Sequence, residues 1–188
     1  MILRFVSLAA LSLWLASPAW AATEWQVTPD SKTITWEGTT GGSTPLTGSC
    51  SRFDSDILFD PAALTTSSVV ILIETGSCLT GDTQKDTYLP QPVWFDVAAF
   101  PTATFEAKNF EHVKGDEYVA NGTLTLKGIS QPVTLPFTLQ IKDKQAHVVG
   151  ETTLQRLDFG IGKDPQLSAP TVAGLAVKVK IDLKATAR

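Results

Sequence analysis

Residues 76–105 decide the fold, and they open with Gly76-Ser77-Cys78-Leu79-Thr80-Gly81. The rest of this stretch carries, in order, Asp86, Leu89, Trp94-Phe95-Asp96, Phe100-Pro101 and Phe105. A second block lies far downstream and reads Leu154-Gln155-Arg156-Leu157-Asp158-Phe159-Gly160-Ile161-Gly162. No single piece is diagnostic, but two such blocks in this order and at this spacing rarely arise by chance.

This pattern resembles the YceI-like family of secreted lipid-binding proteins. The family pattern is a serine, a Thr-Gly pair, an aspartate followed by a leucine, a paired aromatic, an aromatic-Pro step and a strand phenylalanine. It closes far downstream on Arg-x-Asp-Phe-Gly. The resemblance covers roughly Trp25 to Ala187. It implies an eight-stranded antiparallel barrel of the lipocalin type, with one or two short helices over one end.

Residues 1–21 have the features of a secretory signal peptide. Arg4 supplies the only charge, an apolar run follows it, and Ala19-Trp20-Ala21 is a cleavage motif of small residues. The alternative, a retained anchor, would need about 20 apolar residues and a charged stop after them. We therefore expect cleavage after Ala21, a single YceI-like domain over residues 22–188, and a periplasmic or secreted location.

The charge balance excludes several classes of partner. The chain has 15 basic and 19 acidic residues, a net charge of −4, and its basic residues form no cluster. This argues against nucleic acid and against electrostatic docking on anionic membranes. After the leader no apolar stretch approaches the ~18 residues of a membrane span, so we expect no stable membrane insertion after cleavage.

The two cysteines, Cys50 and Cys78, predict one disulfide, because an oxidising compartment favours pairing and a metal site would need more ligands. If Phe59 faces Val69 in a hairpin, the same register brings Cys50 opposite Cys78, with both side chains pointing outward. We expect no metal and no cofactor.

Alternation of apolar and polar residues dominates the mature sequence, as in strands with one wet and one dry face. Helical signals are confined to a turn capped by Asp60 and a short helix over residues 82–89 capped by Asp82. A sheet with one apolar face must form a sandwich or a barrel, and only the resemblance selects the barrel. The predicted strands are residues 33–36, Phe53–Phe59, Ser68–Glu74, 103–110, 118–126, 133–141, 146–154 and 175–183.

An eight-stranded barrel encloses either its own side chains or one small elongated ligand. By resemblance, the ligand would be a long apolar molecule such as an isoprenoid, a quinone tail or a fatty-acid derivative. The apolar side chains expected to line the tube are those of Trp36, Phe53, Ile57, Phe59, Ile71, Ile73, Phe105, Leu124, Leu126, Leu135, Phe137 and Phe159.

Catalytic motifs are lacking: the sequence has no Gly-x-Ser-x-Gly, no phosphate-binding loop, no His-Glu-x-x-His and no Cys-x-x-Cys. The remaining polar candidates, at the mouth of the barrel, are Asp86, Arg156 and Asp158. Arg156 would either bind a polar or anionic ligand head or pin the mouth loops, with the two aspartates as its natural partners. We expect a binding protein and not an enzyme.

A second function stays open from the sequence. The barrel could be filled by its own aromatic side chains and act as a structural or interaction protein of the cell envelope, accessory to a membrane redox partner. The oligomeric state is also open, with a homodimer as one alternative.

Overall fold

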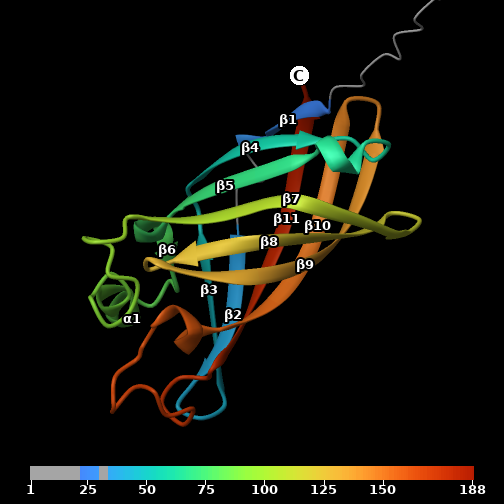
Figure 1. The fold of residues 1–188 in the computed structure, drawn as a ribbon. Helices are drawn as coiled ribbons and strands as arrows, with labels where there is room; N and C mark the ends of the chain where they lie inside the picture. The colour runs from blue at the N-terminus through green and yellow to red at the C-terminus, as the bar shows by residue number, and fades with distance from the viewer. Residues whose placement is uncertain (1–21, 30–33) are drawn as a thin grey trace, which may run out of the picture.

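The computed structural model describes residues 22–29 and 34–188. The expected signal peptide and its cleavage motif lie outside these residues. The described chain forms an all-β, antiparallel, closed barrel with one short helix and several 3-10 turns (Figure 1), as predicted.

Eight strands make the ring, and it closes through the shortest of them. Trp25 of the first strand lies opposite Ile57 on one side and opposite Ala187 on the other, so the first and last strands of the barrel meet. In hydrogen-bonding order the ring is β1 (Thr23–Val27), β4 (Phe53–Phe59), β5 (Ser68–Glu74), β7 (Thr102–Lys114), β8 (Glu117–Leu126), β9 (Ile129–Lys142), β10 (Gln145–Gln155) and β11 (Ala176–Ala187).

Three further strands extend the wall at one end: β2 (Ile34–Thr40), β3 (Thr44–Cys50) and β6 (Cys78–Leu79). β2 pairs with β11, β3 with β2 and β6 with β3. We call the end with the β2–β3 hairpin and residues 156–175, lowest in Figure 1, the lower end. The end with the β9–β10 turn is the upper end. At the lower end β2, β3 and β6 therefore continue the wall that β1 and β4 complete at the upper end.

The sequence placed residues 33–36 in the ring, whereas the ring uses β1 and leaves β2 in the extension. β1 was missed because only Trp25 and Val27 of this short strand are buried, too few for an alternating pattern. The other seven predicted strands coincide with ring strands.

The predicted β4–β5 register is wrong by two residues: Val69 lies opposite Ile57 and not opposite Phe59. Because side chains alternate with period two, an even shift leaves every side chain on its predicted face. Asp54 and Asp56 are exposed, as the alternation of their strand indicates, and Ile71 is buried, as the resemblance implied.

The upper half of the barrel is filled by its own aromatic side chains. The Phe59 ring meets Phe110 edge-on at 5.2 Å between centroids and Tyr118 at 5.9 Å. Tyr118 in turn stacks on Phe137 at 5.6 Å. These rings belong to one buried cluster with Trp25. Such offset and edge-on pairs stabilise a core beyond the area they bury.

The one α-helix of the described residues is α1 (Thr83–Tyr88), and the Asp82 side chain caps it by accepting two backbone N–H groups of its first turn, as predicted. The turn after Asp60 is not α-helical and leads into the 3-10 helix η2 (Leu64–Thr66). No helix in the described part of the chain is long and apolar enough to cross a membrane.

Candidate functional site

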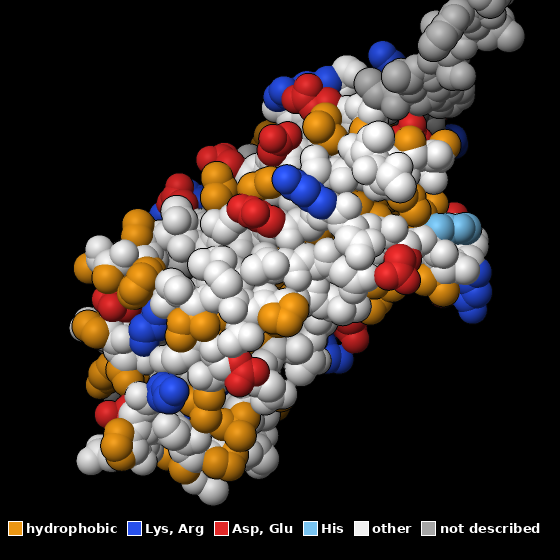
Figure 2. Space-filling model, viewed as in Figure 1, with side chains coloured by type: hydrophobic (Ala, Val, Ile, Leu, Met, Phe, Trp, Pro, Cys, Tyr) orange, Lys and Arg blue, Asp and Glu red, His pale blue; other side chains and the backbone are white. Residues whose placement is uncertain are grey.

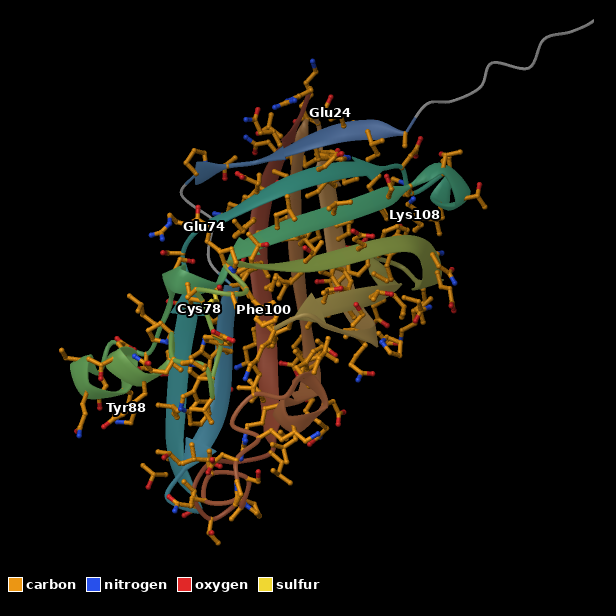
Figure 3. The ribbon with its side chains drawn as sticks, turned by 60° about the vertical axis from the view of Figure 1, so that its left-hand side comes forward. Glu24, Glu74, Cys78, Tyr88, Phe100 and Lys108 are labelled. Carbon is orange, nitrogen blue, oxygen red and sulfur yellow. A yellow bond between two sulfur atoms is a disulfide. The ribbon has the colours of Figure 1, made fainter. Side chains whose placement is uncertain are left out.

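The Cys50–Cys78 disulfide joins β3 to β6 where the wall continues into the lower end (Figure 3). Both cysteines are buried, and Cys50 lies opposite Ile34, a core residue. The bridge is therefore confirmed, but its predicted outward orientation is wrong. The prediction assumed that both cysteines continue the β4–β5 hairpin. Cys78 instead lies in β6, a separate two-residue strand, so the register of that hairpin does not set its orientation.

The interior of the lower half differs from that of the upper half. Leu124 lies opposite the inward-facing Phe105, and Trp36 lies opposite Val179, which packs against the core. These side chains face inward, yet each keeps some exposed surface. The same holds for other apolar residues that lie two positions along the same strands and so point to the same face. The inward-facing, partly exposed apolar residues of the lower half are Trp36, Ile73, Phe105, Leu124, Leu126, Leu154, Val177 and Val179.

The predicted tube residues thus separate into groups. Phe53, Phe59 and Ile71 are fully buried in the core. Ile57, Leu135 and Phe137 are partly buried and pack against that core. Trp36, Ile73, Phe105, Leu124 and Leu126 belong to the lower half described above. Phe159 is 2% exposed but lies in the 3-10 helix η4 (Arg156–Phe159), outside the strands of the wall.

Three lower-half residues were missed by the sequence analysis, namely Leu154, Val177 and Val179. The signal was present, because both valines alternate with Lys178 and Lys180 along β11. Side-chain alternation alone therefore could have found them.

Trp36 has a special place in this lower half because its indole lies flat over Gly48 of the neighbouring strand. A side-chain carbon on Gly48 would come within 2.2 Å of the Trp36 ring, so only glycine fits there. The indole Nε1–H is buried without a hydrogen-bond partner among residues 22–29 and 34–188, whereas that of Trp25 donates to the Phe59 carbonyl at 3.0 Å. An unpaired buried donor is costly, so the protein alone does not fully satisfy this part of the interior.

Arg156 pins the loops of the lower end from inside. It is 5% exposed, and its guanidinium donates to five backbone carbonyl oxygens at 2.8–3.1 Å. Those carbonyls belong to Ile161, Gly162, Leu167, Ala173 and Gly174. A guanidinium has five N–H donors, so all of them are used.

The surroundings of Arg156 fit this role. The guanidinium lies over the Trp94 ring at 6.0 Å, and a side-chain carbon on Gly162 would come within 2.6 Å of Nη1. Burial lowers the pKa of Arg156 from its ordinary value, since desolvation disfavours the charged form. The expected aspartate partners are wrong: every donor meets a carbonyl, and Asp158 is exposed.

Asp86 performs a separate pinning role at the start of α1. Its carboxylate accepts from the Thr80 N–H and hydroxyl, both at 2.7 Å, and from the Gly81 N–H at 3.1 Å. The backbone and hydroxyl bonds from Thr80 hold the pKa of Asp86 below its ordinary value. Asp86 therefore fixes residues 80–86 and does not meet Arg156.

Lys127, in the β8–β9 turn, joins a third segment to this end. Its ammonium donates to the Gly160 carbonyl at 3.1 Å. Burial lowers the pKa of Lys127, and the negative charge of Asp96 partly opposes this shift. The polar groups of the lower end are thus spent on holding loops together.

An open groove crosses the outer faces of β8–β11, on the other side of the wall from the tube. Ion pairs run through it, including His147–Asp182 at 2.7 Å and Lys180–Glu37 at 2.6 Å. A long apolar chain laid there would strip water from these charges without replacing it. The groove is therefore a poor site for the expected ligand.

Catalytic and metal-binding arrangements do not emerge from the described residues. His147 bonds to Asp182, and the His112 Nε2–H donates to the Gly115 carbonyl. Within residues 22–29 and 34–188 no group of three or more His, Cys, Asp or Glu side chains could hold a metal ion.

Comparison with known sequences gives a family. The profile of the YceI-like domain matches residues 25–185. A UPF0312 protein of Azotobacter vinelandii is 32% identical over 63% of this chain and 65% of its own length. A UPF0312 protein of Yersinia pestis is 38% identical over 48% of this chain and 46% of its own length. The chain thus spans less than two thirds of the curated relatives it matches.

Solved structures agree on the architecture. The crystal structure of Burkholderia cenocepacia BcnA is 25% identical with a TM-score of 0.80, covering 86% of this chain and 100% of that one. A polyisoprenoid binding domain from Saccharophagus degradans, implicated in plant cell wall breakdown, is 13% identical with a TM-score of 0.67. It covers 89% of this chain and 99% of that one, and at this identity it shows the fold alone.

Proposed function

The chain belongs to the YceI-like family, and on that premise we propose that it is a binding protein that holds one long apolar lipid in the lower half of its barrel. The ligand would be an isoprenoid, a quinone tail or a fatty-acid derivative, and the binding domain would comprise residues 22–188. The polyisoprenoid-binding description of the Saccharophagus degradans domain, which shares the fold, supports this class of ligand.

The observation that carries the proposal is the set of inward-facing, partly exposed apolar side chains in the lower half, with Trp36, Phe105, Leu124 and Leu126 among them. Each methylene moved from water into such surroundings contributes about 0.8 kcal/mol. A ten-carbon stretch would supply ~8 kcal/mol before the entropy of binding is subtracted, enough for micromolar affinity without a polar anchor.

The disulfide is consistent with an extracytoplasmic location. We propose more specifically that the protein acts in the periplasm or outside the cell, after removal of residues 1–21. Binding there would be sequestration without chemistry, because the polar groups of the lower end hold loops in place.

The test is to purify the folded protein, extract it with organic solvent and identify bound lipid by mass spectrometry. We compare the wild type with Leu126→Asp, which puts a charge inside the lower half, and with Leu72→Asp on the outer face of β5, where Leu72 is 44% exposed. Lipid should accompany the wild type and Leu72→Asp but not Leu126→Asp. Val177→Asp repeats the interior test if Leu126→Asp does not fold.

A second function is favoured by the aromatic cluster of the upper half, which shows that part of this barrel is self-filled. If the whole interior behaved so, the protein would be a structural or interaction protein of the envelope. A lipid-free extract, together with no uptake of geranylgeraniol offered on cyclodextrin, would establish that alternative and refute lipid binding.

A further inference from the structure

Two segments at the tip of the lower end contain no charged residue, although Asp158, Lys163 and Asp164 lie just before the second of them. Neither residues 38–50 nor residues 165–177 contain Lys, Arg, His, Asp or Glu. The chain as a whole is 18% charged, and the upper end of the barrel does carry charged residues. Charged residues of the upper end include Glu24, Lys114, Glu117, Lys142, Asp143, Lys144 and Arg188.

The fold brings the two uncharged segments together, although they are far apart in sequence. The Gly41 N–H donates to the Val172 carbonyl at 3.0 Å, and the Gly174 N–H donates to the Thr39 carbonyl at 2.8 Å. A β-bridge joins Thr40 to Ala173. The β2–β3 hairpin and residues 165–177 therefore form one continuous surface, which we call the uncharged end.

Apolar side chains are exposed on and beside this surface. Val172 is 39% exposed, and Pro45 and Pro170 are also exposed. On the adjoining β6–α1 segment Leu79 is 48% and Tyr88 56% exposed. Figure 2 shows hydrophobic side chains gathered over this lower part of the molecule, with a few acidic and basic side chains above and among them.

We propose that the uncharged end docks on a lipid surface, so that the barrel exchanges its ligand with a membrane through its lower half; this inference rests on the proposed function. Exposed apolar surface without charges loses little hydration when it meets the interfacial region of a bilayer, whereas a charged end would lose much. The inward-facing, partly exposed apolar side chains of the lower half lie in the part of the barrel that ends at this surface. A long isoprenoid is insoluble in water, so its source must be a lipid surface.

The charge of the molecule selects the kind of surface. The chain is net acidic at −4, and the uncharged end offers no cation to an anionic head group. Docking should therefore occur on neutral, zwitterionic lipid and should not weaken with salt, because no ion pair is screened. Binding that required anionic lipid would contradict the proposal.

The experiment is flotation of the full-length mature protein with phosphatidylcholine vesicles at low and high salt. Val172→Asp and Pro45→Asp place a charge on each segment of the uncharged end. Val113→Asp is the matched control, because Val113 is a more exposed valine, at 57%, on the β7–β8 hairpin. We expect the first two variants to reduce vesicle binding at least about tenfold and the control to leave it within about twofold.

A second measurement separates this inference from the proposed function. Geranylgeraniol is offered either on cyclodextrin or in the vesicles, and uptake is measured by extraction. Val172→Asp should take up the lipid normally from cyclodextrin but slowly from vesicles. Wild type that binds from cyclodextrin yet does not float would overturn the docking inference and leave the lipid-binding function intact. Failure to bind from cyclodextrin would refute the function itself.

Two other results would also overturn the inference. One is equal loss of flotation in Val172→Asp and Val113→Asp, which would show that docking is not confined to the uncharged end. The other is a wild type that forms dimers, does not float, and becomes monomeric with Val172→Asp, which would identify this surface as an interface between two copies of the chain.

Discussion

At Arg156 a full positive charge is buried without a carboxylate partner in the described structure, and five carbonyl dipoles stabilise it instead. The carbonyl oxygens present partial negative charge to the guanidinium. The guanidinium thereby holds the loop that carries these carbonyls in place, and the loop in turn fixes the guanidinium. A ligand head group could reach the guanidinium only by displacing one of these bonds. The residue is therefore a pin for residues 156–174.

Replacing Arg156 by Met should lower the free energy of unfolding by ~3 to 5 kcal/mol, because several buried carbonyls would lose their donor. Thermal unfolding followed by circular dichroism measures this. Affinities for an anionic and a neutral lipid should fall alike. Arg156→Lys, which keeps the charge but has fewer donors, should lie in between. A loss confined to the anionic lipid, with unchanged melting, would show that Arg156 serves the head group.

Tyr118 should make the fold less stable at alkaline pH. Burial, and secondarily the charge of Asp116, raise the pKa of its phenol above the ordinary value. The folded state thus binds this proton more tightly than the unfolded state does, so the stabilisation is complete below pH ~10 and is lost as the pH rises through the folded pKa.

Tyr118→Phe should therefore flatten the fall in the free energy of unfolding above pH ~10, measured by urea denaturation at a series of pH values. Tyr88→Phe is the matched control, since Tyr88 is the other tyrosine of the chain and is 56% exposed. An alkaline limb that is the same in both variants would contradict this assignment.

The sequence offered a loop pin as one of two roles for Arg156 and could not name its partners. Carboxylates are visible in a sequence, whereas a set of backbone carbonyls exists only once the loop has folded. For the same reason the unpaired Nε1–H of Trp36 and its contact with Gly48 have no signature in the sequence. What alternation did predict was the shared face of Leu124 and Leu126, whereas Phe105 was expected in the tube through the resemblance.

At the scale of elements, the β3–β6 pairing is the narrowest join in the lower wall. It consists of two residue pairs, Ser49 with Leu79 and Cys50 with Cys78, and the second is covalently linked. Ladder hydrogen bonds over so short a length hold weakly by themselves. The disulfide therefore keeps the wall of the lower half closed around the proposed ligand.

The double variant Cys50→Ser, Cys78→Ser should lose stability by ~3 to 4 kcal/mol in the chain-entropy view of a bridge spanning 28 residues. It should also release lipid faster than the wild type, measured by transfer of geranylgeraniol to empty vesicles. Reduced wild type should behave like the variant. Unchanged release with lowered stability would limit the bridge to a role in folding, and free thiols in the unfolded, unreduced wild type would refute the bridge.

Leu126 should set the length of the ligand. Leu126→Phe would fill part of the lower half, shorten the lipid that fits, and cost only ~1 to 3 kcal/mol of stability. Competition between isoprenoid alcohols of graded length measures the preference. Leu139→Phe is the control, because Leu139 is 7% exposed in the self-filled upper half. It should destabilise without changing the preferred length, and an unchanged preference in Leu126→Phe would place Leu126 in the solid core.

Strand positions and faces followed from alternation, but closure of the ring did not. The pairing of Trp25 with Ile57 and Ala187 joins segments from opposite ends of the chain, and no local pattern specifies such a contact. The β4–β5 register shift shows a related limit, since registers that differ by two residues give the same hydrophobic pattern. The hydrophobic face of each strand could be predicted from the sequence itself. The barrel arrangement of the strands could be predicted only through the resemblance.

The whole molecule has two unlike halves: an upper half with a buried aromatic cluster, and a lower half whose tip carries two uncharged segments. The upper half would supply most of the stability of the fold, and the lower half would take up and release the ligand. Such a division lets the lower end open locally without unfolding the barrel, as cooperative units of different stability do.

The mature chain should begin at Ala22, next to the first ring strand, if the Ala19-Trp20-Ala21 motif is cleaved. N-terminal sequencing of protein recovered from the periplasm or the medium measures this directly. Recovery of intact Met1 in that fraction would contradict cleavage.

The meeting of β1 with β11 also sets the order in which the barrel can be completed. Trp25 and Ala187 are 162 residues apart in the sequence, yet they lie opposite each other in the finished ring. Until the final strand arrives, one edge of β1 lacks its partner, and a contact of such high sequence separation is slow to form. Barrel closure should therefore be a late step of folding, and the incomplete barrel would depend on holding chaperones until β11 arrives.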